Sequence, residues 1–311
     1  MKTVTVAKRG ADRLRQGHLW IYRSDVLDTG NAGGGSVVRI ADQKGNYVGQ
    51  ALFSDSSEIT LRLLTQSDEV IDREWWRGRL HAAASRRTTI AAETNAYRVV
   101  YSEGDLLPSL IIDRYEDVLV MQTLSQGTEA IKSLLVELLL EDFAPRAIVE
   151  RNDVRVRSFE GLELVAGPLF GTLPEELEIT QHGLRFFVAP LAGQKTGSFL
   201  DQRENRLAAR NIAHGRGLDC FTFNGAFALH LAGACDTVTG IDISADAIAV
   251  ARRNAQLNKM SNIEFREANV FDALREFEQA GERFDTIVLD PPAFAKNRAS
   301  LKAATRGYKE I

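Results

Sequence analysis

The sequence predicts a protein of the α/β class, in which a doubly wound parallel sheet follows a small β-barrel and an α+β connector. Three observations predict this order: short alternating runs with glycine turns near the start, one amphipathic helix among strand-like runs in the middle, and a regular alternation of strands and helices after Pro190. We therefore expect a barrel over residues 1–68, a connector over 69–189 and the parallel sheet over 190–311.

The composition excludes several classes of protein. The chain has 311 residues, 44% hydrophobic and 26% charged, which is enough for large cores and argues against disorder. No apolar run approaches the ~18 residues of a membrane span, and the N-terminus lacks the apolar core of a secretory signal. Cys220 and Cys235 are too few for a disulfide or zinc framework. We expect a cytoplasmic protein with no membrane anchor and no metal site.

Positive charge gathers in residues 1–23, where Asp12 is the only acid. A solvated surface explains such a run as well as a binding site does. Aromatic residues follow at once, however, and bases stack on aromatic rings while phosphates pair with arginine and lysine. The candidate residues for binding nucleic acid are Lys8, Arg9, Arg13, Arg15, His18 and Trp20.

The barrel is predicted from alternating runs at residues 36–40, 47–53 and 59–64, which are separated by glycine-containing turns. In the connector, the helical spacing of Trp75 and Trp76 with the apolar residues that follow predicts a helix, with both tryptophans packed between domains. The helices are expected over 72–92 and 129–140, and the strand-like runs at 97–102, 110–113, 118–124, 147–150, 162–166 and 179–188.

The parallel sheet is predicted from continuous apolar runs that alternate with helical patterns. The strands are expected at 217–221, 237–242, 263–268 and 286–290, and the helices between them at 226–234, 245–257 and 270–280.

In such a sheet a ligand binds beyond the carboxyl ends of the strands. The first strand leads into a loop with the single glycine Gly225, so the G-x-G-x-x-G fingerprint of nicotinamide and flavin proteins is absent. The second strand ends at Asp242, whose carboxylate can accept hydrogen bonds from the two hydroxyls of a ribose. Capping of the next helix is the alternative role for Asp242, but Ser244 fills it at least as well.

Two further strand ends carry polar groups. Asn269 could accept a hydrogen bond from the amine of an adenine ring or could cap the next helix. Ile243, Val270 and Phe271 could supply apolar walls for that ring. After the fourth strand, two prolines stiffen the loop and hold Asp290 in an extended conformation at the lip of the site.

Together these residues resemble class I S-adenosylmethionine-dependent methyltransferases, and within them the cytosine-C5 methyltransferases of large-subunit ribosomal RNA that carry an N-terminal PUA domain. The resemblance covers the whole chain and rests on the segments KRG (8–10), GHLWI (17–21), EGDLLPSLIIDRY (103–115), GQKTGSFLDQR (193–203) and DPPAF (290–294). It implies a PUA-like barrel that binds ribosomal RNA, an α+β connector, and a Rossmann-like catalytic sheet that uses S-adenosyl-L-methionine.

The resemblance also assigns roles by position. Gln194, Lys195, Thr196 and Gly197 would cover the methionine end of the cofactor. The contacts to the rest of the cofactor would come from Asp219, Phe221, Asn224 and Gly225 in the first loop, and from Asp242, Ile243, Asn269 and Asp290. Asp290 and Pro291 would form the methyl-transfer site. Ala226 and Asn269 depart from the family, which often has glycine and aspartate at these positions.

Cytosine C5 is not nucleophilic by itself, and the resemblance implies a cysteine thiolate that adds to C6 of the base. Cys220 and Cys235 are expected to be buried core residues instead. The sequence therefore predicts a chain truncated after Ile311, with the nucleophile in roughly one to three further strand–helix units and with the fourth strand left as an open edge. Two alternatives remain open: a methyltransferase acting on an exocyclic nitrogen such as guanine N2, and a non-catalytic protein that binds RNA and cofactor. The expected partner is large-subunit ribosomal RNA, and the assembly to test is a homodimer.

Overall fold

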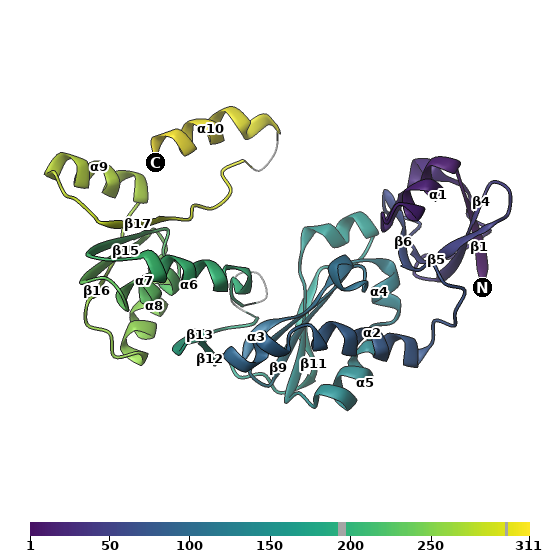
Figure 1. The fold of residues 1–311 in the computed structure, drawn as a ribbon, viewed down its shortest axis with the longest axis horizontal. Coiled ribbons are helices and arrows are strands. Elements are labelled where there is room, and N and C mark those ends of the chain that lie inside the picture. The colour runs from purple at the N-terminus through teal and green to yellow at the C-terminus, as the bar shows by residue number, and fades with distance from the viewer. Residues whose placement is uncertain (192–196, 296–297) are drawn as a thin grey trace. The chain divides into compact units, whose positions relative to one another are not determined.

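The computed structural model describes residues 1–191, 197–295 and 298–311, and Figure 1 shows their course from the N-terminus to the C-terminus. Contacts within the chain divide it into two compact units. The first comprises Met1–Leu177 with Ala189–Ser198, and the second comprises Glu178–Val188 with Phe199–Ile311.

The first unit begins with a six-stranded sheet in the order β2-β6-β5-β4-β1-β3. Its strands are β1 (Lys2–Val6), β2 (Trp20–Tyr22), β3 (Val26–Asp28), β4 (Val37–Asp42), β5 (Tyr47–Phe53) and β6 (Ile59–Thr65). The three runs expected from the sequence are β4, β5 and β6. The helix α1 (Lys8–Arg15) was not expected, because five of its eight residues are charged and only Gly10, Ala11 and Leu14 are buried.

A five-stranded sheet in the order β11-β10-β9-β8-β7 forms the connector. Its strands are β7 (Ala96–Tyr101), β8 (Leu110–Tyr115), β9 (Val118–Thr123), β10 (Ala147–Asn152) and β11 (Val165–Gly171), and its helices are α2 (Arg73–Ser85), α3 (Thr88–Glu93), α4 (Gln126–Ala130) and α5 (Lys132–Phe143). The single helix expected over 72–92 is therefore wrong in one respect, since it breaks between α2 and α3. Arg86 and Arg87 lie at that break and both bind the buried carboxylate of Asp105.

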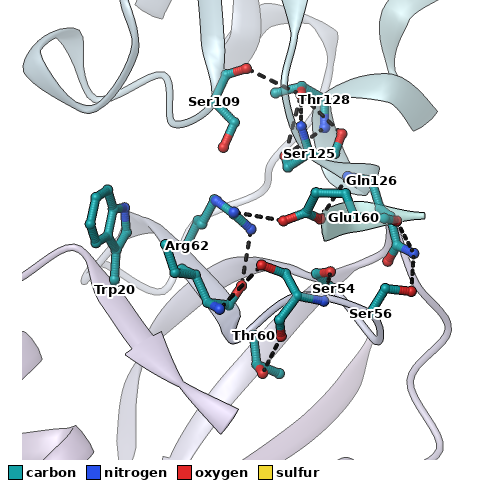
Figure 2. A network of polar contacts seen from close by, with 12 residues as sticks. Trp20, Ser54, Ser56, Thr60, Arg62, Ser109, Ser125, Gln126, Thr128 and Glu160 are labelled. Atoms are coloured by element: carbon teal, nitrogen blue, oxygen red, sulfur yellow. Dashed lines mark hydrogen bonds and ion pairs between the residues drawn. The ribbon is translucent and has the colours of Figure 1, made fainter. Parts of the chain in front are cut away.

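The barrel and the connector share a core and a polar network. Trp76 is buried in a cluster that includes Leu52 and Leu64 of the barrel strands, as expected for a tryptophan between domains. Figure 2 shows Arg62 pointing at Glu160, and their 2.7 Å ion pair is almost completely buried. These contacts explain why the two domains form one unit.

The second unit contains a hairpin, β12 (Leu177–Gln181) and β13 (Leu184–Val188), and a four-stranded parallel sheet in the order β16-β15-β14-β17. The sheet strands are β14 (Arg216–Cys220), β15 (Thr237–Asp242), β16 (Ile263–Glu267) and β17 (Thr286–Leu289). The helices are α6 (Arg203–Ile212), α7 (Ala226–Ala232), α8 (Ala245–Leu257), α9 (Val270–Ala280) and α10 (Leu301–Glu310). Residues 178–188 therefore belong to the same unit as the parallel sheet, although the sequence predicts that the third domain begins at residue 190.

The strand order positions the site. The chain passes from β14 outward through β15 to β16 and then returns to pair β17 with the other side of β14. The strand order therefore reverses at β14, and ligands of doubly wound sheets bind at such a reversal, outside the carboxyl ends of the strands.

Candidate active site

The structure brings the four expected polar groups to the same edge of the parallel sheet. Asp219 on β14 is in register with Gly240 of β15 and Val288 of β17, and Asp242 is in register with Glu267 of β16. Asn269 and Asp290 follow the ends of β16 and β17. This edge is the carboxyl end of every strand in the sheet, as the sequence predicted.

The loop after β14 has a strained backbone. Phe221 and Phe223 adopt positive φ angles of 62° and 51°, which cost non-glycine residues on the order of 1–3 kcal/mol each. Thr222 N donates to Ile241 O at 2.9 Å, and Phe223 N donates to Asp242 Oδ2 at 2.9 Å. Backbone and side-chain groups of β15 therefore hold the loop in this conformation.

Gly225 ends the same loop at a φ of 81°. A Cβ atom at this position would lie 2.9 Å from Phe265 Cζ and 3.0 Å from Ala251 Cβ. Only glycine fits this crowded, left-handed position, so the sequence motif has a steric cause. Asn224, also assigned to the loop, is buried, and its carbonyl accepts a hydrogen bond from Asn254 Nδ2 at 2.9 Å.

Asp219 is 1% exposed and its Oδ2 accepts hydrogen bonds from Thr222 Oγ1 and Ala228 N. Burial raises the pKa of Asp219 to about 7, and these two hydrogen bonds only partly oppose the rise. A carboxyl group of this kind gains a charge readily when a cation approaches it.

Asp242 is half-buried at the tip of β15. Its Oδ2 accepts from Phe223 N, and its Oδ1 accepts from Ser244 N at 2.9 Å. Ser244 caps α8 by accepting from Ala247 N, which confirms that the capping role falls to Ser244. The next residue, Ile243, is 69% exposed and offers an apolar surface beside the carboxylate.

Asn269 caps α9, because its Oδ1 accepts a hydrogen bond from Phe271 N at 2.9 Å. The structure thus shows the capping alternative directly. Val270 was expected to supply an apolar wall for the adenine ring; its side chain is 3% exposed and packs in a core cluster with Leu218 and Ile241. Aromatic rings gather at this position, where Phe271 lies 6.4 Å from Phe221 and 5.9 Å from Phe294 between ring centroids.

Asp290 and Pro291 follow β17 directly, with Asp290 exposed. The negative charge of Asp290 raises the pKa of Asp219, which lies on the neighbouring strand β14. The aromatic cluster continues along this segment, where Phe294 lies 4.6 Å from Tyr308 between centroids. Asp290 therefore lies near the carboxyl group of Asp219 and near the aromatic cluster around Phe294.

Three of the residues assigned to the methionine end, Gln194, Lys195 and Thr196, lie outside the described residues. Gly197 belongs to the first unit and has a φ of 133°. A Cβ atom at this position would lie only 3.2 Å from Pro190 Cα. Ser198 N donates to the hydroxyl of the buried Tyr115 at 3.1 Å. The sequence predicts no role for Tyr115, although the segment 103–115 ends at this residue.

The two cysteines are buried. Cys220 is fully buried and burial raises the pKa of its thiol to about 12, while burial also raises the pKa of the Cys235 thiol. A catalytic cysteine needs the opposite environment, one that favours the thiolate.

The basic candidates of the barrel lie on and after α1. Arg9 Nε and Arg13 Nη1 donate to the two oxygens of buried Asp25, at 2.7 Å and 3.1 Å, while Arg15 pairs with Asp42. Lys8 and His18 are exposed, and Trp20 donates its indole N–H to Glu103 Oε1 at 2.9 Å. Much of the positive charge is therefore paired within the unit, and Trp20 uses its polar edge to hold the connector.

The described residues show neither a metal cluster nor a membrane-spanning helix. They contain no group of three or more His, Cys, Asp or Glu side chains that could hold a metal ion. None of their helices has the length and apolar character required to cross a membrane.

Comparisons with known proteins agree with this architecture. Residues 4–66 match the PUA-like domain family, and residues 213–308 match a methyltransferase domain family. The ribosomal RNA large subunit methyltransferase I of Klebsiella pneumoniae (strain 342) is 40% identical over 317 residues, which cover 99% of this chain and 79% of that protein. The protein of the same name from Yersinia pseudotuberculosis serotype O:1b (strain IP 31758) is 40% identical over 315 residues, covering 98% and 80%.

Two solved structures share the fold. An S-adenosylmethionine-dependent methyltransferase from Streptococcus mutans superposes with a TM-score of 0.79 at 22% identity, covering 99% of this chain and 82% of that one. A methyltransferase complexed with S-adenosylhomocysteine gives a TM-score of 0.80 at 22% identity, covering 96% and 78%. The predicted fold, with a PUA-like domain before a Rossmann-like sheet, is confirmed.

Proposed function

The chain belongs to the ribosomal RNA large subunit methyltransferase I family, and from that premise we propose that it transfers a methyl group from S-adenosylmethionine to C5 of a cytosine in 23S ribosomal RNA. The observation that carries the methyl-transfer proposal is the placement of four polar groups at the carboxyl edge of the sheet, opposite a strained loop. The 40% identity over 99% of the chain supports the ribosomal substrate.

The residues at this edge fit the cofactor. The crowding at Gly225 keeps the loop backbone free of a side chain, so a ligand can approach it closely. Asp242 would hold the ribose hydroxyls, Asp219 would face the amino group, and the rings of Phe221 and Phe271 would flank the adenine. When bound, S-adenosylmethionine supplies an electrophilic methyl group on a positively charged sulfur.

The chain's own residues then position the reaction. Methyl transfer requires the attacking atom in line with the methyl group and the sulfur, so most of the catalytic effect comes from orientation. Pro291 and Pro292 restrict the backbone that follows Asp290, and this rigid segment would orient the target base. A base inside a helix must leave its stack to reach such a site.

The cytosine-C5 part of the proposal requires a thiolate. Cys220 and Cys235 do not fit that role, because both are buried and their pKa values are raised. We assign both to the core. Cys220 is in register with Leu289, next to the exposed Asp290, but it is buried and its pKa is raised. This environment favours a second candidate, methylation of an exocyclic nitrogen such as guanine N2, which needs only an oriented amine.

We also propose a division of labour along the chain. Residues 1–68 would bind ribosomal RNA, residues 69–189 would connect, and residues 190–311, with the hairpin 178–188 packed on them, would carry the chemistry. We propose that the protein acts on ribosomal RNA in the cytoplasm, and analytical ultracentrifugation would test the homodimer.

Mass mapping of methylated nucleotides in 23S ribosomal RNA tests the function, with RNA from cells that have and lack the full-length gene. A single 5-methylcytidine that disappears with the gene supports the proposal. A methylguanosine that disappears instead supports the second candidate, and an unchanged map refutes both. An RNA carrying 5-fluorocytidine at the mapped position adds a mechanistic test, since an enzyme that uses a thiolate is trapped on it as a covalent adduct.

A further inference from the structure

Arg206, on α6 of the second unit, carries a buried charge that forms no ion pair with the described residues. It is 4% exposed, and no carboxylate of the described residues lies within ion-pair distance of it. Its Nη1 donates to Gln181 Oε1 at 2.9 Å and its Nη2 donates to Phe199 O at 3.0 Å, so both partners are neutral. A buried charge that forms no ion pair costs free energy, which a bound anion would offset.

Two buried donors in this place lack acceptors. Arg206 Nε has no hydrogen-bond partner in the described part of the chain, and the same holds for Nε2 of Gln181, which is 1% exposed. The two side chains are hydrogen-bonded to each other, so their unsatisfied N–H groups belong to one small cluster. Buried polar groups are almost always satisfied, and adjacent unsatisfied donors indicate a missing acceptor.

The cluster borders the candidate active site. The guanidinium carbon of Arg206 lies 5.9 Å from the ring centroid of Phe227, in the first turn after the strained loop. Phe199, whose carbonyl accepts from Arg206, packs edge-on against Phe223 of that loop at 5.7 Å. The charges of Asp201, Asp219 and Asp290 all act on Arg206, with Asp201 acting most strongly, and Arg206 acts in turn on Asp219.

We propose that Arg206 binds the carboxylate of the methionyl end of the cofactor and so makes the site selective for adenosine ligands that carry an amino acid. This inference rests on the proposed function and deepens it. A guanidinium forms strong, charge-assisted hydrogen bonds with a carboxylate, and Arg206 has the free donor that such a bond needs. Burial lowers the pKa of Arg206 to about 10, so it stays charged at neutral pH.

Calorimetry with three ligands tests the inference: S-adenosylmethionine, S-adenosylhomocysteine and 5′-methylthioadenosine, which lacks the amino acid half. In the variant Arg206→Met, we expect the affinities for the first two to fall about 30-fold or more, with the affinity for methylthioadenosine unchanged. Arg206→Lys should restore part of the loss. Arg210→Met, on the same helix and partly exposed, is the matched control and should change none of the three.

A purely structural role for Arg206, holding the hairpin through Gln181, makes a different prediction. In that case Arg206→Met would lower the affinities for all three ligands equally and would also lower the melting temperature of the protein. That result would overturn the inference. The wild-type protein gives a test that needs no variant, because equal affinity for S-adenosylmethionine and its decarboxylated form would also overturn it. If the wild type discriminates between these two ligands but leaves 23S ribosomal RNA unmodified, the inference stands and the proposed function fails.

Discussion

Asp242 Oδ2 accepts a hydrogen bond from Phe223 N at 2.9 Å, so a carboxylate at the tip of β15 holds a loop residue of β14 in the left-handed region. Asp242 therefore has two roles in the proposal: it shapes the loop and it would bind the ribose. Both roles depend on the same two oxygens, which still have lone pairs after accepting from Phe223 N and Ser244 N.

The first prediction concerns this residue. Asp242→Ala should lower the affinity for S-adenosylmethionine at least about 100-fold, because it removes two charge-assisted hydrogen bonds and frees a strained loop. Asp242→Asn keeps one acceptor and should lose less. Calorimetry measures both, with Asp246→Ala in the exposed first turn of α8 as the control. Unchanged affinity in Asp242→Ala would remove the ribose assignment.

The second prediction separates backbone strain from crowding at glycine. Gly225 and Gly183 have similar φ angles of 81° and 79°, but a Cβ atom would meet Phe265 and Ala251 at Gly225 and nothing within 4 Å at Gly183. Gly183→Ala should cost only the left-handed strain, about 1–2 kcal/mol. Gly225→Ala should cost more and should also weaken cofactor binding. Hydrogen exchange of α7 and calorimetry check this, and equal costs would show that crowding is unimportant.

Much of the parallel sheet could be predicted from the sequence. The strand at 237–242 and the helices at 245–257 and 270–280 match β15, α8 and α9 residue for residue, because unbroken apolar runs and helical spacing are local signals. The break after α2 could not be predicted, since it depends on Asp105, which lies far along the chain from Arg86 and Arg87.

The site was predictable only in part, for the same reason. The strand ends could be located because parallel strands present their carboxyl ends at one edge. The burial of Arg206 could not be predicted from the sequence, because it depends on Gln181 in the hairpin before α6 and on the packing of Phe199. Asn269 satisfied two local rules at once, and the sequence alone did not decide between capping and ligand binding.

The third prediction concerns pH. Because burial raises the pKa of Asp219 to about 7, most of the free protein carries a neutral carboxyl at pH 6. An ammonium group placed beside Asp219 favours the carboxylate, so cofactor binding should release a proton. Affinity should then fall as the pH drops below about 7, by up to about tenfold per pH unit.

Calorimetry at pH 6 in two buffers of different ionisation enthalpy measures the proton released. Asp219→Asn cannot release one, so its binding enthalpy should be the same in both buffers. If the wild-type and Asn variants release the same number of protons, another group titrates and the amino-group assignment of Asp219 is wrong.

The fourth prediction concerns the buried ion pair that joins the barrel to the connector. Arg62 and Glu160 are 7% and 1% exposed at the side chain, so Glu160→Gln leaves a buried guanidinium without its counter-charge. We expect a loss of about 3–5 kcal/mol in the unfolding free energy of the first unit, and a smaller loss when both residues are replaced by methionine. The three tryptophans all lie in this unit and report its unfolding in urea.

The exposed pair of Arg39 and Asp68 provides the control for that experiment. Its side chains are 44% and 63% exposed, so Asp68→Asn should cost less than about 1 kcal/mol. If both substitutions cost the same, the buried pair is not what couples the two domains.

The last prediction concerns RNA binding by the barrel. Arg9 and Arg13 hold the buried Asp25, so replacing them would damage the fold along with any phosphate contact. Lys8 is exposed on the same helix and has no ion pair in the described residues, so Lys8→Gln tests the surface cleanly. Affinity for a 23S ribosomal RNA fragment should fall steeply with salt, and Lys8→Gln should reduce the slope of log affinity against log salt by about one. Lys44→Gln, in the exposed turn between β4 and β5, should leave the slope unchanged. A flat salt dependence in the wild type would mean that the barrel binds a partner other than RNA.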